Sequence, residues 1–303
     1  MSRPAPALVV LVFAVLTLIW GTTWAAIRVT LEGIPPLTGV ALRFGVASIL
    51  LLALMRAMGI RCTWSRQERR VWLLNATLAF AGSYGIVHWA EQYVPSGLAS
   101  VLFATFPLFV AILAHHALPG DRITPARGAG IAIGFAGVAV IFSEDLTRLG
   151  GQHVGLASVV MLGSPLVSAI ASVGAKRWGA GIHPFSMTAV PMGIAAVMMG
   201  VLAAVVERDR PLLLAPRPLA AILYLALFGS AITFSLYYWM LARIPATRVA
   251  LLAFTIPVVA VVFGALVMHE PITGRTIAGG ALVMAGVVLA VRPGRREPQH
   301  RAP

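Results

Sequence analysis

A repeat along the chain is the feature that most restricts its possible folds. Four residues of the first half recur 150 residues later: Trp89, Pro95, Thr105 and Pro107 correspond to Trp239, Pro245, Thr255 and Pro257. Both copies lie in strongly apolar sequence, and the second proline of each falls inside a run long enough to cross a membrane. Duplicated apolar halves with a proline at membrane depth are typical of transporters built from two structural repeats. A soluble enzyme is therefore not expected.

The composition also indicates a membrane protein. Hydrophobic residues make up 59% of the chain and charged residues only 11%, whereas a soluble protein carries about a quarter charged residues. The net charge of +13 comes from short loops between apolar runs, which is typical of a membrane surface rather than of nucleic-acid binding. The single cysteine, Cys62, cannot form an intrachain disulfide or a cysteine metal cluster. We expect the lipid bilayer as a partner, no nucleic acid, no metal and no other cofactor.

Ten apolar runs approach the length of about 20 residues that a helix needs to cross the hydrocarbon core. They are residues 7–27, 36–56, 71–91, 96–118, 127–143, 154–175, 184–206, 219–241, 247–268 and 276–292. The first run is too long for the apolar part of a typical signal peptide, so we expect it to be retained. The sequence therefore predicts an all-α integral membrane protein with ten transmembrane helices.

The basic residues of the connections predict the orientation. With the N-terminus in the cytoplasm, cytoplasmic segments carry sixteen arginines and lysines and the opposite side carries six, so both termini are predicted inside. Because five helices per half is an odd number, the second half enters the membrane inverted relative to the first. We predict a first repeat over residues 1–150, an inverted second repeat over 151–292, and a cytoplasmic tail over 293–303.

Several motifs together resemble the EamA-type ten-helix exporters of the drug/metabolite transporter superfamily, including bacterial amino-acid exporters. They are Trp20-Gly21-Thr22-Thr23-Trp24, Pro36 followed by Leu42-Arg43-Phe44, the prolines Pro107 and Pro257, and His269-Glu270-Pro271 with Gly279 and Gly286. The resemblance covers nearly the whole chain. One departure is Asp121, which aligns with Glu270 where the family often has glutamate. The resemblance implies outward transport of small organic metabolites, often amino acids.

The paired prolines are predicted to interrupt their helices. Pro107 and Pro257 fall near the centres of their runs, where proline removes a backbone donor and frees a carbonyl one turn earlier. Pro165 is predicted to act in the same way in the sixth run. A hinge at the repeat interface is the functional interpretation, and a packing kink is the alternative.

A central cavity is predicted between the first, third and fourth segments and their counterparts, the sixth, eighth and ninth. Helical spacing places rings and ionisable groups on one face of the third segment and three serines on one face of the sixth. Rings pack side chains or hold cations, and hydroxyls bind ammonium or carboxylate groups. The predicted lining residues are Trp20, Trp24, Tyr84, His88, Thr105, Ser164, Ser168, Ser172, Phe234, Tyr238, Trp239 and Thr255.

These residues also have structural interpretations. The tryptophans suit an interfacial belt, and the serines suit close helix packing. Arg43, His88 and Glu91 are candidates for a charge relay, although Arg43 and Glu91 are also placed to snorkel outward and His88 suits a structural hydrogen bond. Arg43 is equally suited to attract a carboxylate or to pair with Glu91 or Glu32. Asn75, at the inner start of its helix, is expected to be solvated.

The sequence thus predicts an inner-membrane exporter of small metabolites that works by alternating access, with amino acids, including aromatic and hydrophobic ones, as the first substrates to test. The alternative is proton-coupled efflux of drugs or cationic compounds, with Glu91 or His88 as the relay. A membrane-embedded enzyme is disfavoured because acidic residues and histidines are not grouped. Monomer and homodimer both stay open.

Overall fold

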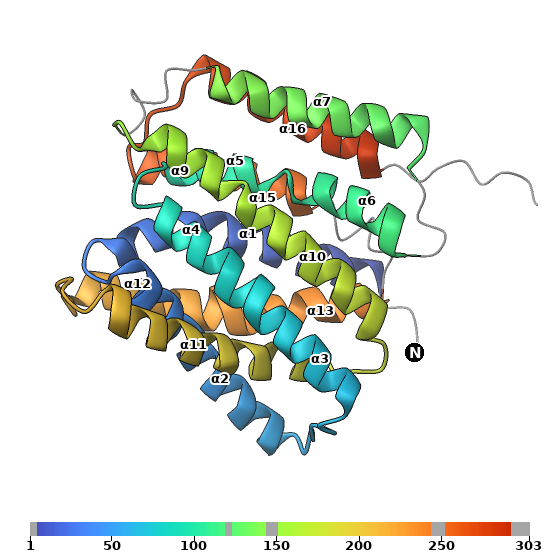
Figure 1. Ribbon diagram of the computed structural model, residues 1–303, viewed down its shortest axis with the longest axis vertical. Coiled ribbons are helices and arrows are strands. Elements are labelled where there is room, and N and C mark those ends of the chain that lie inside the picture. Colours follow the sequence, from blue (N-terminus) through green and yellow to red (C-terminus); the bar gives the residue numbers. More distant parts are fainter. Residues whose placement is uncertain (1–4, 119–122, 144–150, 244–251, 292–303) are drawn as a thin grey trace, which may run out of the picture.

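The computed structural model describes residues 5–118, 123–143, 151–243 and 252–291, and all regular secondary structure in these ranges is helical (Figure 1). Six helical stretches are long and apolar enough to cross a membrane, judged by length and composition: Ala7–Leu31, Pro36–Ala57, Ser96–Ala117, Val154–Trp178, Ser186–Val206 and Pro216–Met240. The all-helical class and the membrane-length apolar helices are thus confirmed. The predicted tail and the residues Asp121 and Pro245 lie outside the described ranges.

The helices of the first half follow its five apolar runs. They are α1 (Pro6–Leu31), α2 (Pro36–Ala57), α3 (Arg66–Leu74), the π-helix η1 (Asn75–Ser83), α4 (Tyr84–Ala90), α5 (Ser96–Phe103), α6 (Phe106–Ala117) and α7 (Pro125–Phe142). Several begin with a proline, whose fixed φ and missing N–H suit the first turn. α3 begins differently, because the Glu68 N–H donates to the Ser65 hydroxyl at 3.1 Å.

The second half repeats this order. Its helices are α9 (Val154–Met161), α10 (Gly163–Trp178), α11 (Ser186–Val206), α12 (Pro216–Ala226), the π-helix η2 (Leu227–Ile232), α13 (Thr233–Arg243), α15 (Leu252–Val267) and α16 (Gly274–Val291). A π-helix occupies the same place in each half, since η1 joins α3 to α4 and η2 joins α12 to α13. Such stretches are rare and occur frequently at functional sites. From the sequence, ordinary α-helix was expected in both runs.

The prolines differ in their placement. Pro107 lies in the first turn of α6, after α5 has ended at Phe103, and Pro165 lies in the first turn of α10, after α9 has ended. Pro257 lies inside α15, which continues on both sides of it. At equivalent positions of the repeat, the proline therefore follows a helix break in the first half and sits within a helix in the second.

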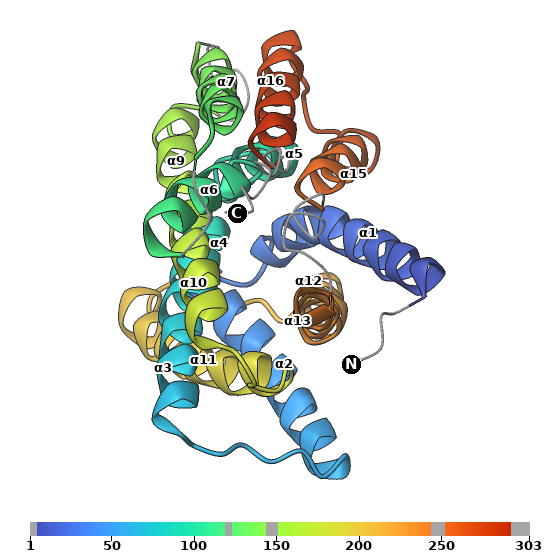
Figure 2. The same ribbon diagram turned by 90° about the vertical axis from the view of Figure 1, so that its right-hand side faces the viewer.

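Helices of the first half are paired with helices of the second. α2 packs along α11, and α7 packs along α16 at the opposite end of the molecule (Figures 1 and 2). Between these pairs, α1 packs on α12 and α15, while α10 packs on η1 and α6. Figure 2 shows α12 and α13 nearly end-on between α1 and the α2–α11 pair. Each hydrophobic cluster found among the described residues contains side chains from both halves, so the two halves share their core.

Glycines allow α7 and α16 to approach closely. A methyl group at Gly286 would lie 2.6 Å from the Gly134 Cα, and one at Gly137 would lie 2.6 Å from the Gly279 carbonyl oxygen. Small residues are the usual means by which membrane helices bring their backbones together. These glycines therefore serve packing within the chain.

Candidate functional site

Arg43 of α2 is buried between the two halves. Its side chain is 1% exposed. Its Nε donates to the Ser230 hydroxyl at 2.7 Å, and its Nη2 donates to the Gly229 carbonyl at 2.9 Å, both in η2. The guanidinium also lies over the Tyr84 ring, 4.6 Å from its centroid. Nη1 has no hydrogen-bond partner among the described residues. The snorkelling interpretation of Arg43 is therefore wrong.

The expected acidic partners do not neutralise Arg43. Glu32 instead pairs with Arg217 on the surface at 3.2 Å, and Glu91 forms no ion pair with Arg43. No carboxylate of the described residues forms an ion pair with this guanidinium. A buried, uncompensated positive charge is expensive in a membrane interior and is typical of a functional position.

His88 lies in α4 and Glu91 at its C-cap, on the helix that packs against α2 and carries Tyr84. Both are fully buried, and neither the His88 ring nitrogens nor the Glu91 carboxylate oxygens have a hydrogen-bond partner in the described part of the chain. His88 faces Gly39 of α2, because a methyl group at Gly39 would lie 3.4 Å from His88 Nδ1. The expectation that Glu91 reaches water is wrong. Arg43, His88 and Glu91 together are called the polar column below.

Aromatic rings from both halves meet beside the polar column. The Trp20 ring of α1 lies 5.5 Å from the Phe234 ring of α13, and Phe234 lies 6.1 Å from the Tyr84 ring of α4. All three side chains are half-buried. Three residues predicted to line a cavity are thus brought together, and their rings offer apolar faces next to unsatisfied polar groups.

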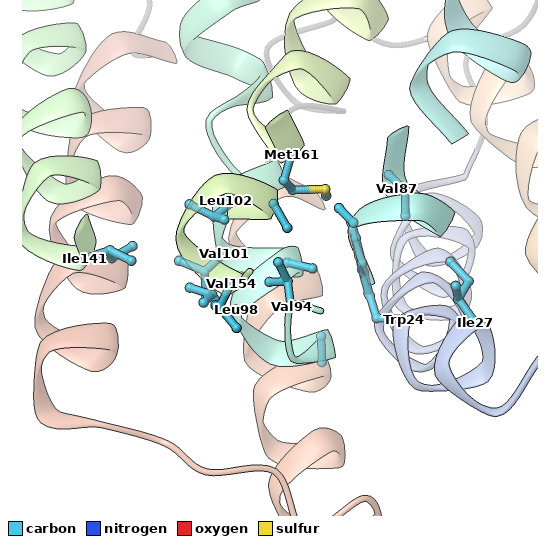
Figure 3. Close-up of a cluster of buried hydrophobic side chains, with 14 of the residues drawn as sticks. Trp24, Ile27, Val87, Val94, Leu98, Val101, Leu102, Ile141, Val154 and Met161 are labelled. Atoms are coloured by element: carbon cyan, nitrogen blue, oxygen red, sulfur yellow. The ribbon is translucent and has the colours of Figure 1, made fainter. Parts of the chain in front are cut away.

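Trp24 lies in a hydrophobic cluster one turn from Trp20. Figure 3 shows its ring beside Val87, with Ile27 and Met161 nearby. It is 8% exposed, and its ring centroid lies 5.6 Å from that of Phe103. The contacts of Trp24 are with other helices, so it is not placed as an exposed interfacial tryptophan.

The serines of α10 connect helices. Ser164 shares a hydrogen bond of 2.7 Å with Ser83 of η1, and Ser168 donates to Ser83 at 2.8 Å. Ser172, one turn further along, is half-buried. In this conformation two of the three serines are used for contact between the halves.

The repeat threonines have different environments. The Thr105 hydroxyl donates to the Leu102 carbonyl at 2.7 Å, at the break between α5 and α6. The Thr255 hydroxyl shares a hydrogen bond of 2.7 Å with Thr17, which joins α15 to α1. Each threonine is therefore used in backbone or helix–helix bonding.

Tyr238 and Trp239 lie towards the other end of α13. The Tyr238 hydroxyl accepts a hydrogen bond of 3.2 Å from Asn75, which also donates to the Met187 carbonyl at 3.3 Å. Asn75 is 1% exposed, so the expectation that it is solvated is wrong. The half-buried Trp239 packs against the Arg243 guanidinium, 4.7 Å from its ring centroid.

Two glutamates accept hydrogen bonds from helix starts at the end of the molecule that is predicted to face outward. The sequence patterns did not indicate this role for either of them. Glu270 accepts from the N–H and the hydroxyl of Ser96, both at 2.8 Å, at the start of α5. Glu207 accepts from the N–H groups of Leu37 and Thr38 at 2.8 and 2.9 Å, at the start of α2. Carboxylates suit the unpaired N–H groups and the positive dipole of a helix start. Among the described residues, no group of His, Cys, Asp and Glu could hold a metal ion.

The apolar helices are long enough to cross a membrane several times, which is typical of a multi-pass membrane protein. They are paired between two halves around unsatisfied polar groups and rings, which is typical of proteins that transport solutes. The chain belongs to the EamA-like transporter family, whose model matches residues 7–143 and again residues 155–292. The resemblance found in the sequence is thereby confirmed, and a transporter of this family implies a small-molecule substrate.

Two relatives agree with this assignment, and a solved structure shares the fold. The chain is 32% identical over 287 residues to the uncharacterized inner membrane transporter YedA of Escherichia coli K12, covering 91% of this chain and 88% of the relative. It is 28% identical over 273 residues to the uncharacterized transporter YoaV of Bacillus subtilis, covering 90% and 93%. A solved crystal structure shares the fold, with a TM-score of 0.69 and 20% sequence identity over 92% of this chain and 95% of the other.

Proposed function

We propose that this protein exports small organic metabolites across the bacterial inner membrane, with amino acids, including aromatic and hydrophobic ones, as the first candidates. Transport proceeds by alternating access through a central cavity between two inverted repeats of five helices, with both termini in the cytoplasm. The double match of one family model supports the two repeats. The name of the YedA relative supports the inner membrane, and the charge of the loops supports the orientation.

One observation carries this proposal. Rings of Trp20, Tyr84 and Phe234, from α1, α4 and α13, meet beside the unsatisfied Arg43 guanidinium. Ligand sites are mostly apolar and aromatic with a few convergent polar groups, and this arrangement draws its rings from both halves and its unsatisfied polar groups from the first. A site at the junction of two repeats is where alternating access requires the substrate to bind.

The test is transport by purified protein in proteoliposomes. Amino acids, polyamines, nucleosides and cationic dyes are screened first, and the transported solute is then measured with Trp20→Ala, Phe234→Ala and His88→Ala. Each variant is expected to lose at least about tenfold in transport, because a site contact contributes about 1.4 kcal/mol or more. Phe228→Ala is the matched control, since Phe228 lies in η2 before α13 and is 40% exposed.

Transport at the wild-type rate by all three cavity variants would contradict the proposed site. The motion is tested separately. We propose Pro107 as the hinge, because the helix is interrupted between α5 and α6, just ahead of this proline. Pro165 is proposed as a second break. Pro257, the repeat equivalent of Pro107, lies inside a continuous helix. Pro107→Ala is expected to slow transport while the affinity for the substrate is retained. Loss of both transport and affinity would argue for a packing role instead.

The second candidate function is proton-coupled efflux of cationic or drug-like compounds. The unpartnered, fully buried His88 and Glu91 favour it, because ionisable groups at membrane depth often relay protons. Export is measured with and without an imposed pH gradient, for wild type and for Glu91→Gln. A gradient-driven export of cationic dyes that Glu91→Gln abolishes would support this function over metabolite export.

A further inference from the structure

The polar column combines a guanidinium, an imidazole and a carboxylate, and among the described residues only two nitrogens of the guanidinium have hydrogen-bond partners. Resting on the proposed function, we propose that it is a two-ended site for an α-amino acid zwitterion, in which Arg43 binds the carboxylate and Glu91 binds the ammonium group. The assignment names the residue that holds each end of the substrate. It also distinguishes this site from one for a simple cation or a simple anion.

The carboxylate end is defined by the free part of the Arg43 guanidinium. Two of its nitrogens are held by Ser230 and Gly229, while Nη1 has no partner within the described residues. The guanidinium keeps its charge at any physiological pH and offers donors in a planar fork that matches a carboxylate. The existing bonds orient the group and leave one donor edge for a ligand. An anionic oxygen is the ligand atom that suits this free donor edge.

The ammonium end is defined by the Glu91 carboxylate. Both of its oxygens are fully buried and lack a hydrogen-bond partner among the described residues. The nearby Arg28 donates to the backbone carbonyl of Glu91 at 2.5 Å and pairs instead with the Glu270 carboxylate, at 3.9 Å. An ionised carboxylate only accepts hydrogen bonds, so the ligand group that suits Glu91 is a hydrogen-bond donor. A cationic donor forms the strongest such bond.

The spacing of the two ends suits one small zwitterion. Arg43 lies at the level of Tyr84, and Glu91 follows seven residues later, at the C-cap of α4, which is about 10 Å at the helical rise per residue. Among the described residues the two groups form no ion pair with each other. Two charge-assisted hydrogen bonds of about 2.8 Å, with about 3 Å of amino-acid backbone between them, span a separation of this order.

The surroundings place the remaining parts of the substrate. His88 lies one turn from Glu91 and faces α2 one turn from Arg43, so its unpartnered nitrogens flank the bound backbone. The half-buried rings of Trp20 and Phe234 lie on the side of Tyr84 and would pack an apolar side chain. Because the polar column is closed off from solvent, binding requires the helices around it to open, as alternating access does.

The test uses probes that differ only in their charged ends. The purified full-length protein is mixed with L-phenylalanine, 3-phenylpropanoate or 2-phenylethylamine, and with the matched set L-leucine, 4-methylpentanoate and 3-methylbutylamine. Binding is measured by thermal stabilisation and by calorimetry. The wild type is expected to bind an amino acid most tightly, its carboxylate analogue more weakly, and the amine most weakly, since the amine meets the Arg43 charge without a carboxylate.

Substitutions then separate the two ends. Arg43→Gln is expected to weaken the amino acid and the carboxylate about 10- to 100-fold, the usual effect of losing a hydrogen bond to a charged group. Glu91→Gln is expected to weaken the amino acid by a similar factor without weakening the carboxylate probe. Arg43→Lys keeps the positive charge and is measured in its place if Arg43→Gln does not fold. Glu32→Gln and Arg217→Gln are matched controls, because they remove an exposed ion pair and leave all affinities unchanged.

The outcomes that overturn the inference are specific. Tighter binding of the amine than of the amino acid would do so, as would amino-acid binding that neither Glu91→Gln nor any Arg43 variant changes. If the protein transports another solute but binds none of the six probes, the zwitterion site is refuted while the exporter stands. If proteoliposomes transport no solute of the broader screen, the proposed function itself is refuted.

Discussion

The carboxylate of Glu207 is expected to be a large contributor to stability. It lies at the C-terminal end of α11, is 6% exposed, and accepts three hydrogen bonds from the start of α2. Two of the donors are backbone N–H groups that have no partner within α2, because the first turn of a helix leaves its amides free. The third is the Thr38 hydroxyl at 2.8 Å. Glu207 therefore fastens the first half to the second.

The expected loss follows from these bonds. A hydrogen bond to a charged group contributes about 1.5–3 kcal/mol, and removal of a helix cap costs about 0.5–2 kcal/mol. The three bonds share one carboxylate and water can reach freed N–H groups at the surface, so the contributions do not add fully. We expect Glu207→Ala to lower the free energy of unfolding by about 2–4 kcal/mol, and Glu207→Gln, which keeps one acceptor oxygen, by about half as much.

The measurement is reversible unfolding in mixed micelles, followed by circular dichroism. Asp209→Ala is the control, because Asp209 pairs with Arg208 at 3.1 Å on the surface and its side chain is 86% exposed; a change below about 0.5 kcal/mol is expected there. A loss of less than about 1 kcal/mol for Glu207→Ala, or a loss equal to that of the control, would refute the argument that these three bonds hold the halves together.

Three further substitutions test the packing in the same unfolding assay. Gly286→Leu is expected to cost about 2 kcal/mol or more, because its side chain would collide with the backbone of α7, whereas Gly274→Leu, with open space around it, is expected to change stability by less than about 0.5 kcal/mol; equal effects would contradict the close approach. Asn75→Ala is expected to cost about 1–3 kcal/mol by leaving the Tyr238 hydroxyl unpaired, and Tyr238→Phe should recover part of that loss in a double-mutant cycle. Ser83→Ala, which removes the partner of two serines, is expected to cost about 1–2 kcal/mol, and no change would argue against the serine contact.

Helix positions were largely predictable from the sequence. The second run, 36–56, became α2 (Pro36–Ala57), and the seventh, 184–206, became α11 (Ser186–Val206). Apolar length and starting prolines are local signals, so they mark where a helix begins and ends. The π-helices η1 (Asn75–Ser83) and η2 (Leu227–Ile232) lie in the middle of apolar runs, away from the ends that these signals mark.

Individual polar residues were much less predictable. Arg43, Glu91 and Asn75 were each given an interpretation in which the side chain reaches water, and all three are buried. Position within a run estimates the distance to the membrane surface, but it does not reveal which neighbouring helix covers the side chain. The ring face of the third segment was found from its spacing alone, and it does meet rings of the second half.

The sequence by itself determined that this chain is a duplicated, helical membrane protein, because lipid requires long apolar runs whose backbone bonds are made within each helix. Only the tertiary structure decided which polar groups are satisfied. The partner of the Arg43 Nε is Ser230, 187 residues away along the chain, and the acceptor carbonyl lies in a π-helix of the other half. Bonds between the halves depend on how two repeats pack, which no local pattern contains, and the unsatisfied groups left by that packing are where a substrate is proposed to bind.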